Sequence, residues 1–307
     1  MYDEITARTY KPAPCVAFIV EYPVKREVFA STFKDRVIHH LIYHYMETVL
    51  DSRFIHDSYS CRVGKGTLFG IRRLQQHVRS CSQNHTRPIY AMKMDLEGYF
   101  MNMNRSILYR QLEQHIAKPH PHWETIPIDL LKYLIRETIF ADPTVDCRYN
   151  TPPHTWIGLP KSKSLFHSPP DCGLPIGNLT SQIFSNVYLH DLDNFIKHKL
   201  KCKYYGRYVD DFFILSASQD PEYYRHLRQE IDNFLRKNLE LNLHPKKFYL
   251  QHYSKGIPFL GVVVYPYHTV VNRRNKANYL KATPEKKQDY KGMFLHHNSY
   301  KILTTRP

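Results

Sequence analysis

The chain has 307 residues, with 43 Lys and Arg against 28 Asp and Glu and a formal net charge of +15. Its 42% hydrophobic share excludes a disordered basic tail, and no run reaches the roughly 20 apolar residues that a membrane-spanning helix needs. Such an excess of positive charge favours a polyanionic partner, above all nucleic acid, because Lys and Arg release counterions from phosphates. A basic surface that serves solubility alone is the alternative.

The chain start and the cysteines indicate the compartment. Residues 1–10 contain Asp3 and Glu4 and lack the apolar stretch of a secretory signal, so we expect a cytoplasmic protein without a membrane partner. The six cysteines show no C-x-x-C spacing, which argues against a zinc ribbon and a disulfide scaffold.

The first half of the chain alternates between helical and strand patterns, without internal repeats or flexible linkers. Apolar spacing predicts a helix over 28–49. A short apolar run over 89–94 predicts a buried strand that ends at Asp95. Further helices are expected over 105–116, with Asn104 as N-cap, and over 128–139.

The second half begins with a Pro- and Ser-rich segment, 141–172, which predicts a long ordered loop. Helices are predicted over 180–200 and 221–238, and a strand pair over 257–265. Two β-rich runs, 203–208 and 212–215, flank Val209, Asp210 and Asp211 and predict a hairpin with an acidic pair at its tip. From residue 266 on, nine Lys and Arg against two acids predict a basic helical lobe that touches a phosphate backbone.

Carboxylates therefore stand where two predicted strands end, at Asp95 and at Asp210-Asp211. Hard oxygen ligands from separate strands suit Mg²⁺, which keeps part of its water and binds one or two carboxylates plus substrate phosphates. An Asp pair between apolar β-formers forces like charges together beside the core, and a cation would relieve that repulsion. Surface carboxylates on a hairpin are the plainer alternative.

Five motifs in order identify a family. Residues 207–212 (RYVDDF) resemble the Y-x-D-D motif of reverse transcriptases, and 93–100 (KMDLEGYF) resemble the first palm motif of that family. Residues 173–182 (GLPIGNLTSQ) resemble its template- and nucleotide-contacting loop and helix. Residues 244–247 (HPKK) are similar to its lysine-bearing motif, and 259–261 (FLG) to its primer-grip hairpin.

The resemblance implies an α+β right-hand polymerase fold with fingers, an antiparallel-sheet palm and a short helical thumb. We expect fingers over 1–88 and a palm over 89–265, with an inserted fingers segment at about 117–172 and a primer-grip hairpin at 257–265. A short, basic and truncated thumb would follow over 266–307. The implied activity is RNA-directed DNA polymerisation with two Mg²⁺ ions, or Mn²⁺ as a substitute, on an RNA template, a DNA or RNA primer and dNTPs.

A finer resemblance is to the reverse transcriptases of diversity-generating retroelements. It rests on residues 26–30, 35–40, 58–67 and 163–166, and on Ile176 where group II intron enzymes usually carry Gln. It implies error-prone cDNA synthesis together with a small basic accessory protein. The alternatives are a group II intron-like or phage-defence reverse transcriptase and, from another class, a catalytically silent nucleic-acid-binding protein.

The resemblance also implies roles for the acidic residues and their neighbours. Asp95, Asp210 and Asp211 would hold the metal ions with the backbone carbonyl of Leu96. Lys247 would donate a proton to the leaving pyrophosphate, with Lys246 as a rival.

Other implied roles concern the nucleotide and the template-primer. Arg62 and Lys65 would bind the triphosphate, with Arg72 as a rival for one of these roles. Phe100 would exclude a 2′-hydroxyl. Ile176 and Gly177 would line the nucleotide pocket, where Ile176 either lowers fidelity by removing a polar contact or is a tolerated packing substitution.

Further expectations concern the template, the primer and the clustered histidines. Ser181 and Gln182 would contact the template or cap their helix, and the primer grip would consist of Phe259, Leu260 and Gly261. The clustered histidines lack structural-zinc spacing with cysteine, and we interpret them as surface or nucleic-acid contacts: His39, His40, His115, His120, His122, His296 and His297.

Overall fold

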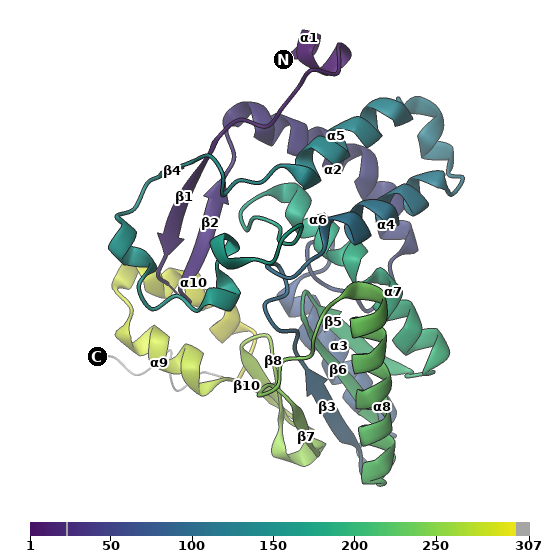
Figure 1. Ribbon diagram of the computed structural model, residues 1–307. Helices are drawn as coiled ribbons and strands as arrows, with labels where there is room; N and C mark the ends of the chain where they lie inside the picture. The colour runs from purple at the N-terminus through teal and green to yellow at the C-terminus, as the bar shows by residue number, and fades with distance from the viewer. Residues whose placement is uncertain (23, 299–307) are drawn as a thin grey trace.

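The computed structural model describes residues 1–22 and 24–298, and its lower half is built on a four-stranded antiparallel sheet (Figure 1). The strand order is β5-β6-β3-β7. The strands are β3 (Tyr90–Met94), β5 (Tyr204–Tyr208), β6 (Asp211–Ser216) and β7 (Tyr249–His252). The predicted strand before Asp95 and the predicted acidic hairpin are confirmed, whereas β7 is an addition.

Side chains of β3 and β6 are buried on both faces of this sheet, which explains why these two central strands are mostly apolar. Met92 of β3 and Ile214 of β6 lie in the main core with α6 (Leu179–Tyr188) and α8 (Pro221–Phe234). On the other face, Phe213 of β6 packs with α3 (Thr67–Cys81) and with Phe259. The sheet edge that carries the carboxylates is thus held between two packed layers.

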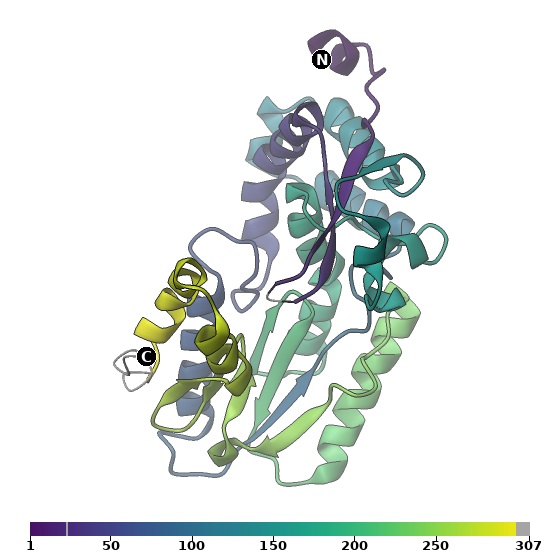
Figure 2. The same ribbon diagram turned by 90° about the vertical axis from the view of Figure 1, so that its left-hand side faces the viewer.

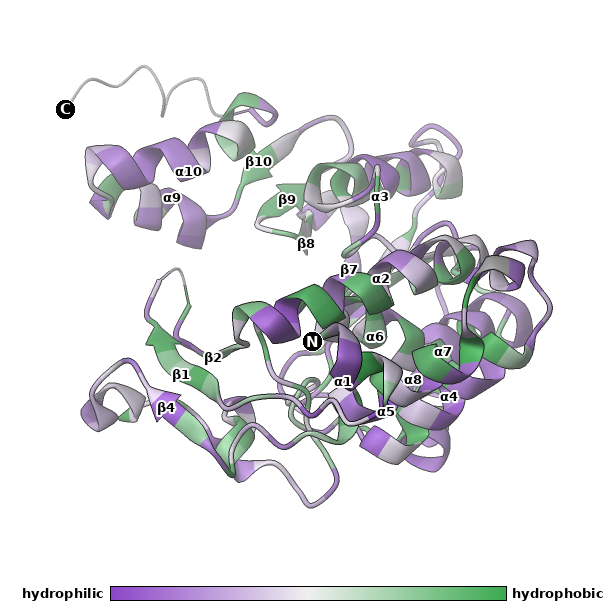
Figure 3. Cartoon of the chain, turned by 90° about the horizontal axis from the view of Figure 1, so that it is seen from above, coloured by the Kyte–Doolittle hydropathy of each residue, from purple (hydrophilic) through white to green (hydrophobic). Residues whose placement is uncertain are grey.

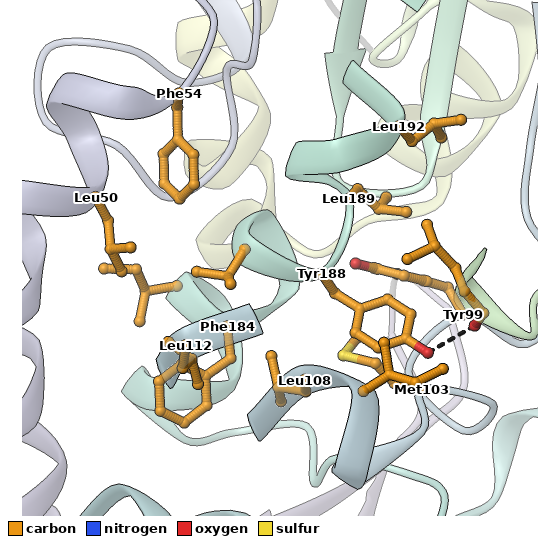
Figure 4. Close-up of a cluster of buried hydrophobic side chains, with 14 of the residues drawn as sticks. Leu50, Phe54, Tyr99, Met103, Leu108, Leu112, Phe184, Tyr188, Leu189 and Leu192 are labelled. Atoms are coloured by element: carbon orange, nitrogen blue, oxygen red, sulfur yellow. Dashed lines mark hydrogen bonds between the residues drawn. The ribbon is translucent and has the colours of Figure 1, made fainter. Parts of the chain in front are cut away.

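A layer of long helices stands above the sheet in Figure 1: α2 (Phe33–Arg53), α4 (Arg105–Ala117) and α5 (Ile128–Phe140). Figure 4 shows side chains of α2 and α4 meeting those of α6, with Leu50, Leu112 and Phe184 around one centre. Asn104 caps α4 by accepting a hydrogen bond from the backbone N–H of Ile107, as predicted.

Three predicted helices have different bounds. The helix expected over 28–49 begins only at Phe33, since the extended residues before it form β2 (Arg26–Ala30), and Thr32 caps the helix by accepting from the N–H of Asp35. The helix expected over 180–200 is divided into α6, α7 (His190–Asn194) and a π turn (Phe195–Lys199). The helix expected over 221–238 ends as α8 at Phe234 and continues as a π turn (Leu235–Leu239).

A second, small sheet of order β2-β1-β4 lies beside the helical layer. β1 (Cys15–Val20) pairs antiparallel with β2 and parallel with β4 (Cys147–Tyr149). The sequence pattern predicted none of these three strands. The predicted loop 141–172 otherwise consists of turns and three single 3₁₀ turns (Pro153–Trp156, Lys161–Lys163, Leu165–His167). Another 3₁₀ turn spans Pro121–Thr125, and a short helix α1 spans Tyr2–Thr6.

The C-terminal part starts with a three-stranded sheet of β8 (Ile257–Phe259), β9 (Val262–Val264) and β10 (Thr269–Val271). The helices α9 (Arg273–Lys281) and α10 (Pro284–Leu295) follow, so the predicted helical lobe is confirmed up to residue 298, and β10 is an addition. Both helices are largely hydrophilic in Figure 3. Figure 2 shows them on the side of the molecule where α3 lies, and Gln75 of α3 donates to Thr269 at 2.8 Å.

No helix in the described part of the chain has both the length and the apolar character needed to cross a membrane.

Candidate active site

The pairing of β3 with β6 brings the three predicted carboxylates to one edge of the central sheet. Met94, the last residue of β3, is opposite Phe212 in the antiparallel register, so Asp95, which directly follows the strand, comes next to Asp211. Tyr208 pairs with Asp211, which leaves a two-residue turn that contains Asp210. Residues more than 100 positions apart in the sequence are therefore neighbours through strand register alone.

The turn that carries Asp210 is strained and is stabilised by a hydrogen bond from a buried arginine. Val209 has φ of 56°, a left-handed conformation that is costly for a β-branched residue. The guanidinium of Arg207 donates to the Val209 carbonyl at 2.9 Å. Arg207 is itself fully buried and donates twice to the carboxylate of Asp193, at 2.7 and 2.8 Å. The hydroxyl of Tyr205 donates to the same carboxylate at 2.6 Å. The arginine that holds the turn is therefore fixed by a buried ion pair whose carboxylate accepts three hydrogen bonds.

The site concentrates negative charge. Burial, the nearby Asp95 and Asp211 raise the pKa of Asp210 to about 6. Burial also raises the pKa of Asp211, against the opposing effect of Lys93. The ammonium of Lys93 lies 3.0 Å from the Asp211 carboxylate, and that of Lys247 lies 2.9 Å from Asp95. Three carboxylates and two lysines thus form one electrostatic unit.

The donor set fits a divalent cation by chemical type, since it consists of hard carboxylate oxygens whose mutual repulsion a cation would relieve. Within residues 1–22 and 24–298, no three His, Cys, Asp or Glu side chains already converge on a point that could hold a metal ion. Lys93 and Lys247 neutralise two of the carboxylates in this arrangement. Leu96 follows Asp95 directly and its side chain is buried.

The two lysines considered as proton donors differ in position. Both are exposed, but Lys247 donates to Asp95, whereas the backbone N–H of Lys246 donates to the ring of His244. Lys93 received no role from the sequence, although it is the one charged residue in the apolar run 89–94. That charge was the signal, because a lysine within a buried strand needs a partner.

Two of the predicted triphosphate residues, Arg62 and Lys65, lie in the loop before α3, beside β5. Arg62 is occupied by the protein: it pairs with Asp51 and donates to the Ile55 and Ser58 carbonyls at 2.7 and 3.0 Å. Lys65 donates to the His56 carbonyl at 2.6 Å, and burial together with Arg62 lowers the pKa of Lys65 to about 8.

Two other predicted nucleotide contacts differ in exposure. Arg72 is exposed on α3. The ring of Phe100 is partly buried between two core clusters, next to Tyr99 at 5.4 Å between ring centroids.

The loop before α6 runs tightly over β2. The carbonyl of Ile176 accepts from the N–H of Phe29 at 2.9 Å, and the Ile176 side chain packs partly into a small core cluster. Gly177 has φ of 122°, and a Cβ there would stand 2.9 Å from Val28, so only glycine suits this approach. In the first turn of α6, Ser181 is buried and Gln182 is exposed.

The predicted primer grip forms the tight turn between β8 and β9. Phe259 pairs with Val262, and both turn residues have positive φ, 49° at Leu260 and 86° at Gly261, as a type I′ turn requires. The buried ring of Phe259 lies 5.4 Å from the ammonium of Lys93, which connects this hairpin to Asp211.

The interpretation of the clustered histidines as surface or nucleic-acid contacts is wrong for two of them. His39 and His115 are buried, with 8% and 4% of their surface exposed. Helical spacing put both on the inner faces of α2 and α4, and burial lowers the pKa of His39 to about 4 and that of His115 to about 3.

An antiparallel sheet with carboxylates at one edge, helices on its faces and a basic helical lobe after it defines a right-hand polymerase fold. Residues 25–264 match the family model described as "Reverse transcriptase (RNA-dependent DNA polymerase)". The chain therefore belongs to the reverse transcriptase family, whose members are RNA-directed DNA polymerases.

Individual relatives are distant. Protein YkfC of Escherichia coli (strain K12) is 21% identical over 89% of this chain and 71% of its own length. Among solved structures, the apo telomerase of Candida tropicalis truncated from its C-terminal domain has a TM-score of 0.61 and 11% identity, over 88% of this chain and 59% of that one. Telomerase from Candida albicans, in complex with a TWJ fragment of telomeric RNA, has a TM-score of 0.57 and 10% identity, over 87% and 48%. This chain spans about half the length of those telomerases, and the likeness concerns the fold.

Proposed function

We propose that this protein extends a primer 3′-end with dNTPs by copying an RNA template, in a reaction that depends on two divalent metal ions. The observation that carries the proposal is the position of Asp95 next to Asp211 and beside the Asp210 turn. The fully buried Arg207–Asp193 pair supports it, since so rigid a mount suits groups that must hold a fixed geometry. The domain division expected from the sequence belongs to this proposal: fingers over 1–88, palm over 89–265 and thumb from 266 on.

Asp95, Asp210, Asp211 and the carbonyl of Leu96 are the groups that would hold the metal ions, and Mg²⁺, with Mn²⁺ as a substitute, fits their hard oxygens. When bound, the ions supply the positive charge that favours an ionised 3′-hydroxyl and a leaving pyrophosphate. Lys93 and Lys247 would then have to give up their carboxylate partners, because they neutralise the same oxygens that would bind the ions.

Lys247 would hold a proton at Nζ and give it to the leaving pyrophosphate. Its exposure of 52% leaves its side chain free to turn from Asp95 toward a phosphate. Lys65 would reach the triphosphate by giving up a single carbonyl contact. Arg62 would have to break several contacts to do so, and its role is to shape the loop. Exposed Arg72 would then be the second triphosphate contact.

The remaining proposed contacts follow the template-primer. Phe100 would stack under the sugar, and Ile176 and Gly177 would face the base pair being formed. Gln182, exposed where Ser181 is buried, would touch the template, and Ser181 would support the helix. The turn at Leu260 and Gly261, fixed on Phe259, would hold the primer end.

We further propose that the polymerase is error-prone and acts within a diversity-generating retroelement, with a small basic accessory protein. Ile176 supports the low fidelity, because an apolar side chain cannot replace a hydrogen bond that holds the correct pair. A group II intron-like or phage-defence enzyme would share the active site. Neighbouring genes distinguish these roles: a template and variable repeat pair supports the first, and an intron RNA or a defence cassette supports the others.

The test is primer extension on poly(rA)/oligo(dT) and on a mixed-sequence RNA template with Mg²⁺. We expect extension by the natural chain and none by Asp210→Asn/Asp211→Asn. Asp232→Asn, which removes a carboxylate from the surface ion pair between α8 and the π turn after it, is the matched control and should extend normally. RNA binding without extension by the natural chain, also in Mn²⁺, would favour a catalytically silent binding protein.

Fidelity is tested separately by scoring misincorporation opposite each template base. Ile176→Gln should lower the error rate about tenfold, as one restored hydrogen bond predicts. An unchanged error rate would favour Ile176 as a packing substitution.

A further inference from the structure

His39 on α2 is buried beneath the loop that precedes α6, and both of its ring nitrogens have partners. Nδ1 lies 2.8 Å from the hydroxyl of Thr180, and Nε2 lies 3.2 Å from the hydroxyl of Ser31. The Ser31 hydroxyl donates in turn to the side-chain oxygen of Asn178 at 2.7 Å. The ring thus connects α2 to two positions of one short segment, 178 and 180.

The number of available hydrogens fixes the direction of this chain. Ser31 has one hydroxyl hydrogen and gives it to Asn178, so its oxygen accepts from Nε2–H of His39. Nδ1 is then the acceptor for the Thr180 hydroxyl, as a neutral imidazole requires. Burial, which lowers the pKa of His39 to about 4, keeps the ring in that neutral form.

The same loop has little other support on this side. A cavity of about 530 Å³ is lined by residues 10–15, by the C-terminal end of α5 and by Ser31, His39, Pro175 and Asn178. Side chains that border a cavity lose packing partners, so the polar bonds carry more of the positioning. On the opposite side, the loop is held by the bond from Phe29 N–H to the Ile176 carbonyl and by the packing of the Ile176 side chain into its small core cluster.

We propose that His39 is a positioning residue for nucleotide selection, which fixes the 176–178 loop through Thr180 on one side and through Ser31 and Asn178 on the other. This inference rests on the proposed function for its effect on nucleotides. Its structural part, the hold on the loop, stands independently of activity.

The structural part is tested by hydrogen exchange on the free protein. In His39→Ala, the amide of Phe29 should exchange about tenfold faster, because its acceptor, the Ile176 carbonyl, is no longer held. His40→Ala, an exposed neighbour on the same helix, and His115→Ala, a buried histidine on α4, are the controls. Unchanged exchange at Phe29 in His39→Ala, or equal acceleration in His115→Ala, would overturn the proposal.

The functional part is tested by steady-state kinetics with two half-repairs. His39→Ala should raise the KM for the correct dNTP about tenfold and leave kcat within about twofold, with poorer discrimination against wrong dNTPs. His39→Asn can still accept from Thr180 and His39→Gln can still donate to Ser31, so each should recover part of the KM.

The outcomes separate the two proposals. Equal KM in the natural chain and in His39→Ala would overturn the role in selection while the polymerase stands. If the natural chain does not extend primers, the proposed function fails, the selection role fails with it, and hydrogen exchange alone decides the hold on the loop.

Discussion

The buried Arg207–Asp193 pair should be the most sensitive point of the site. Arg207→Met removes both bonds to Asp193 and the bond to the Val209 carbonyl. A buried carboxylate left without its partner costs about 3 to 5 kcal/mol. That is a large part of the roughly 5 to 15 kcal/mol that stabilises an ordinary domain.

The measurement is the free energy of unfolding from urea titration, alongside primer extension. Arg236→Met, which breaks an exposed pair with Asp232, is the control and should cost at most about 1 kcal/mol. In Arg207→Met/Asp193→Asn the neutral amide still accepts from Tyr205, so part of the stability should return. Activity should stay low, because the strained Val209 turn has lost its donor. A cost below about 1 kcal/mol for Arg207→Met, or equal costs for the single and double variants, would refute the reasoning.

Four further predictions rest on the described contacts. Burial beside Asp95 raises the pKa of Asp210 to about 6, so the folded state binds a proton more tightly than the unfolded state, and this contribution to stability is lost as the pH rises from about 4 to 6. Asp210→Asn should therefore melt a few degrees higher than the natural chain above pH 7, with the gap closing near pH 4; an equal gap at both pH values would contradict this. Mg²⁺ should raise the melting temperature of the natural chain more than that of Asp210→Asn, and EDTA should reverse the rise, because an ion that binds only the folded state stabilises it; equal shifts in both proteins would exclude a metal site here. Gly261→Ala should cost about 1 to 3 kcal/mol in urea unfolding, since φ is 86° and the new Cβ would clash with the side-chain amide of Asn275; a neutral effect would show that the turn relaxes freely. Phe100→Ala should lower the preference for dNTPs over rNTPs at least tenfold in kcat/KM, and an unchanged preference would limit this ring to packing.

The sequence predicted the parts of the site whose pattern is local. The apolar run before Asp95 and the β-rich runs around Asp210 and Asp211 predicted the strands and the hairpin that the structure contains. Asn104 predicted the start of its helix, because an N-cap residue bonds to the backbone within one turn. The prediction of a helix from residue 28 was wrong at its start. The spacing of Val28 and Phe29 suits a helical face and an extended strand equally, and pairing with β1 decided for the strand.

What only the tertiary structure decided is how distant segments meet. Strand register put Asp95 next to Asp211 and Lys93 beside Asp211, and the segment before β7 brought Lys247 to Asp95. No local spacing encodes register between strands so far apart. Tertiary packing also decided the position of His39. We expected it to be a surface or nucleic-acid contact, and in the structure it is buried against Thr180. The sequence by itself determined, through short motifs, which residues we propose to carry the chemistry. The fold determined which of them share one edge of a sheet, because long-range pairing depends on burial and hydrogen bonding across the whole chain.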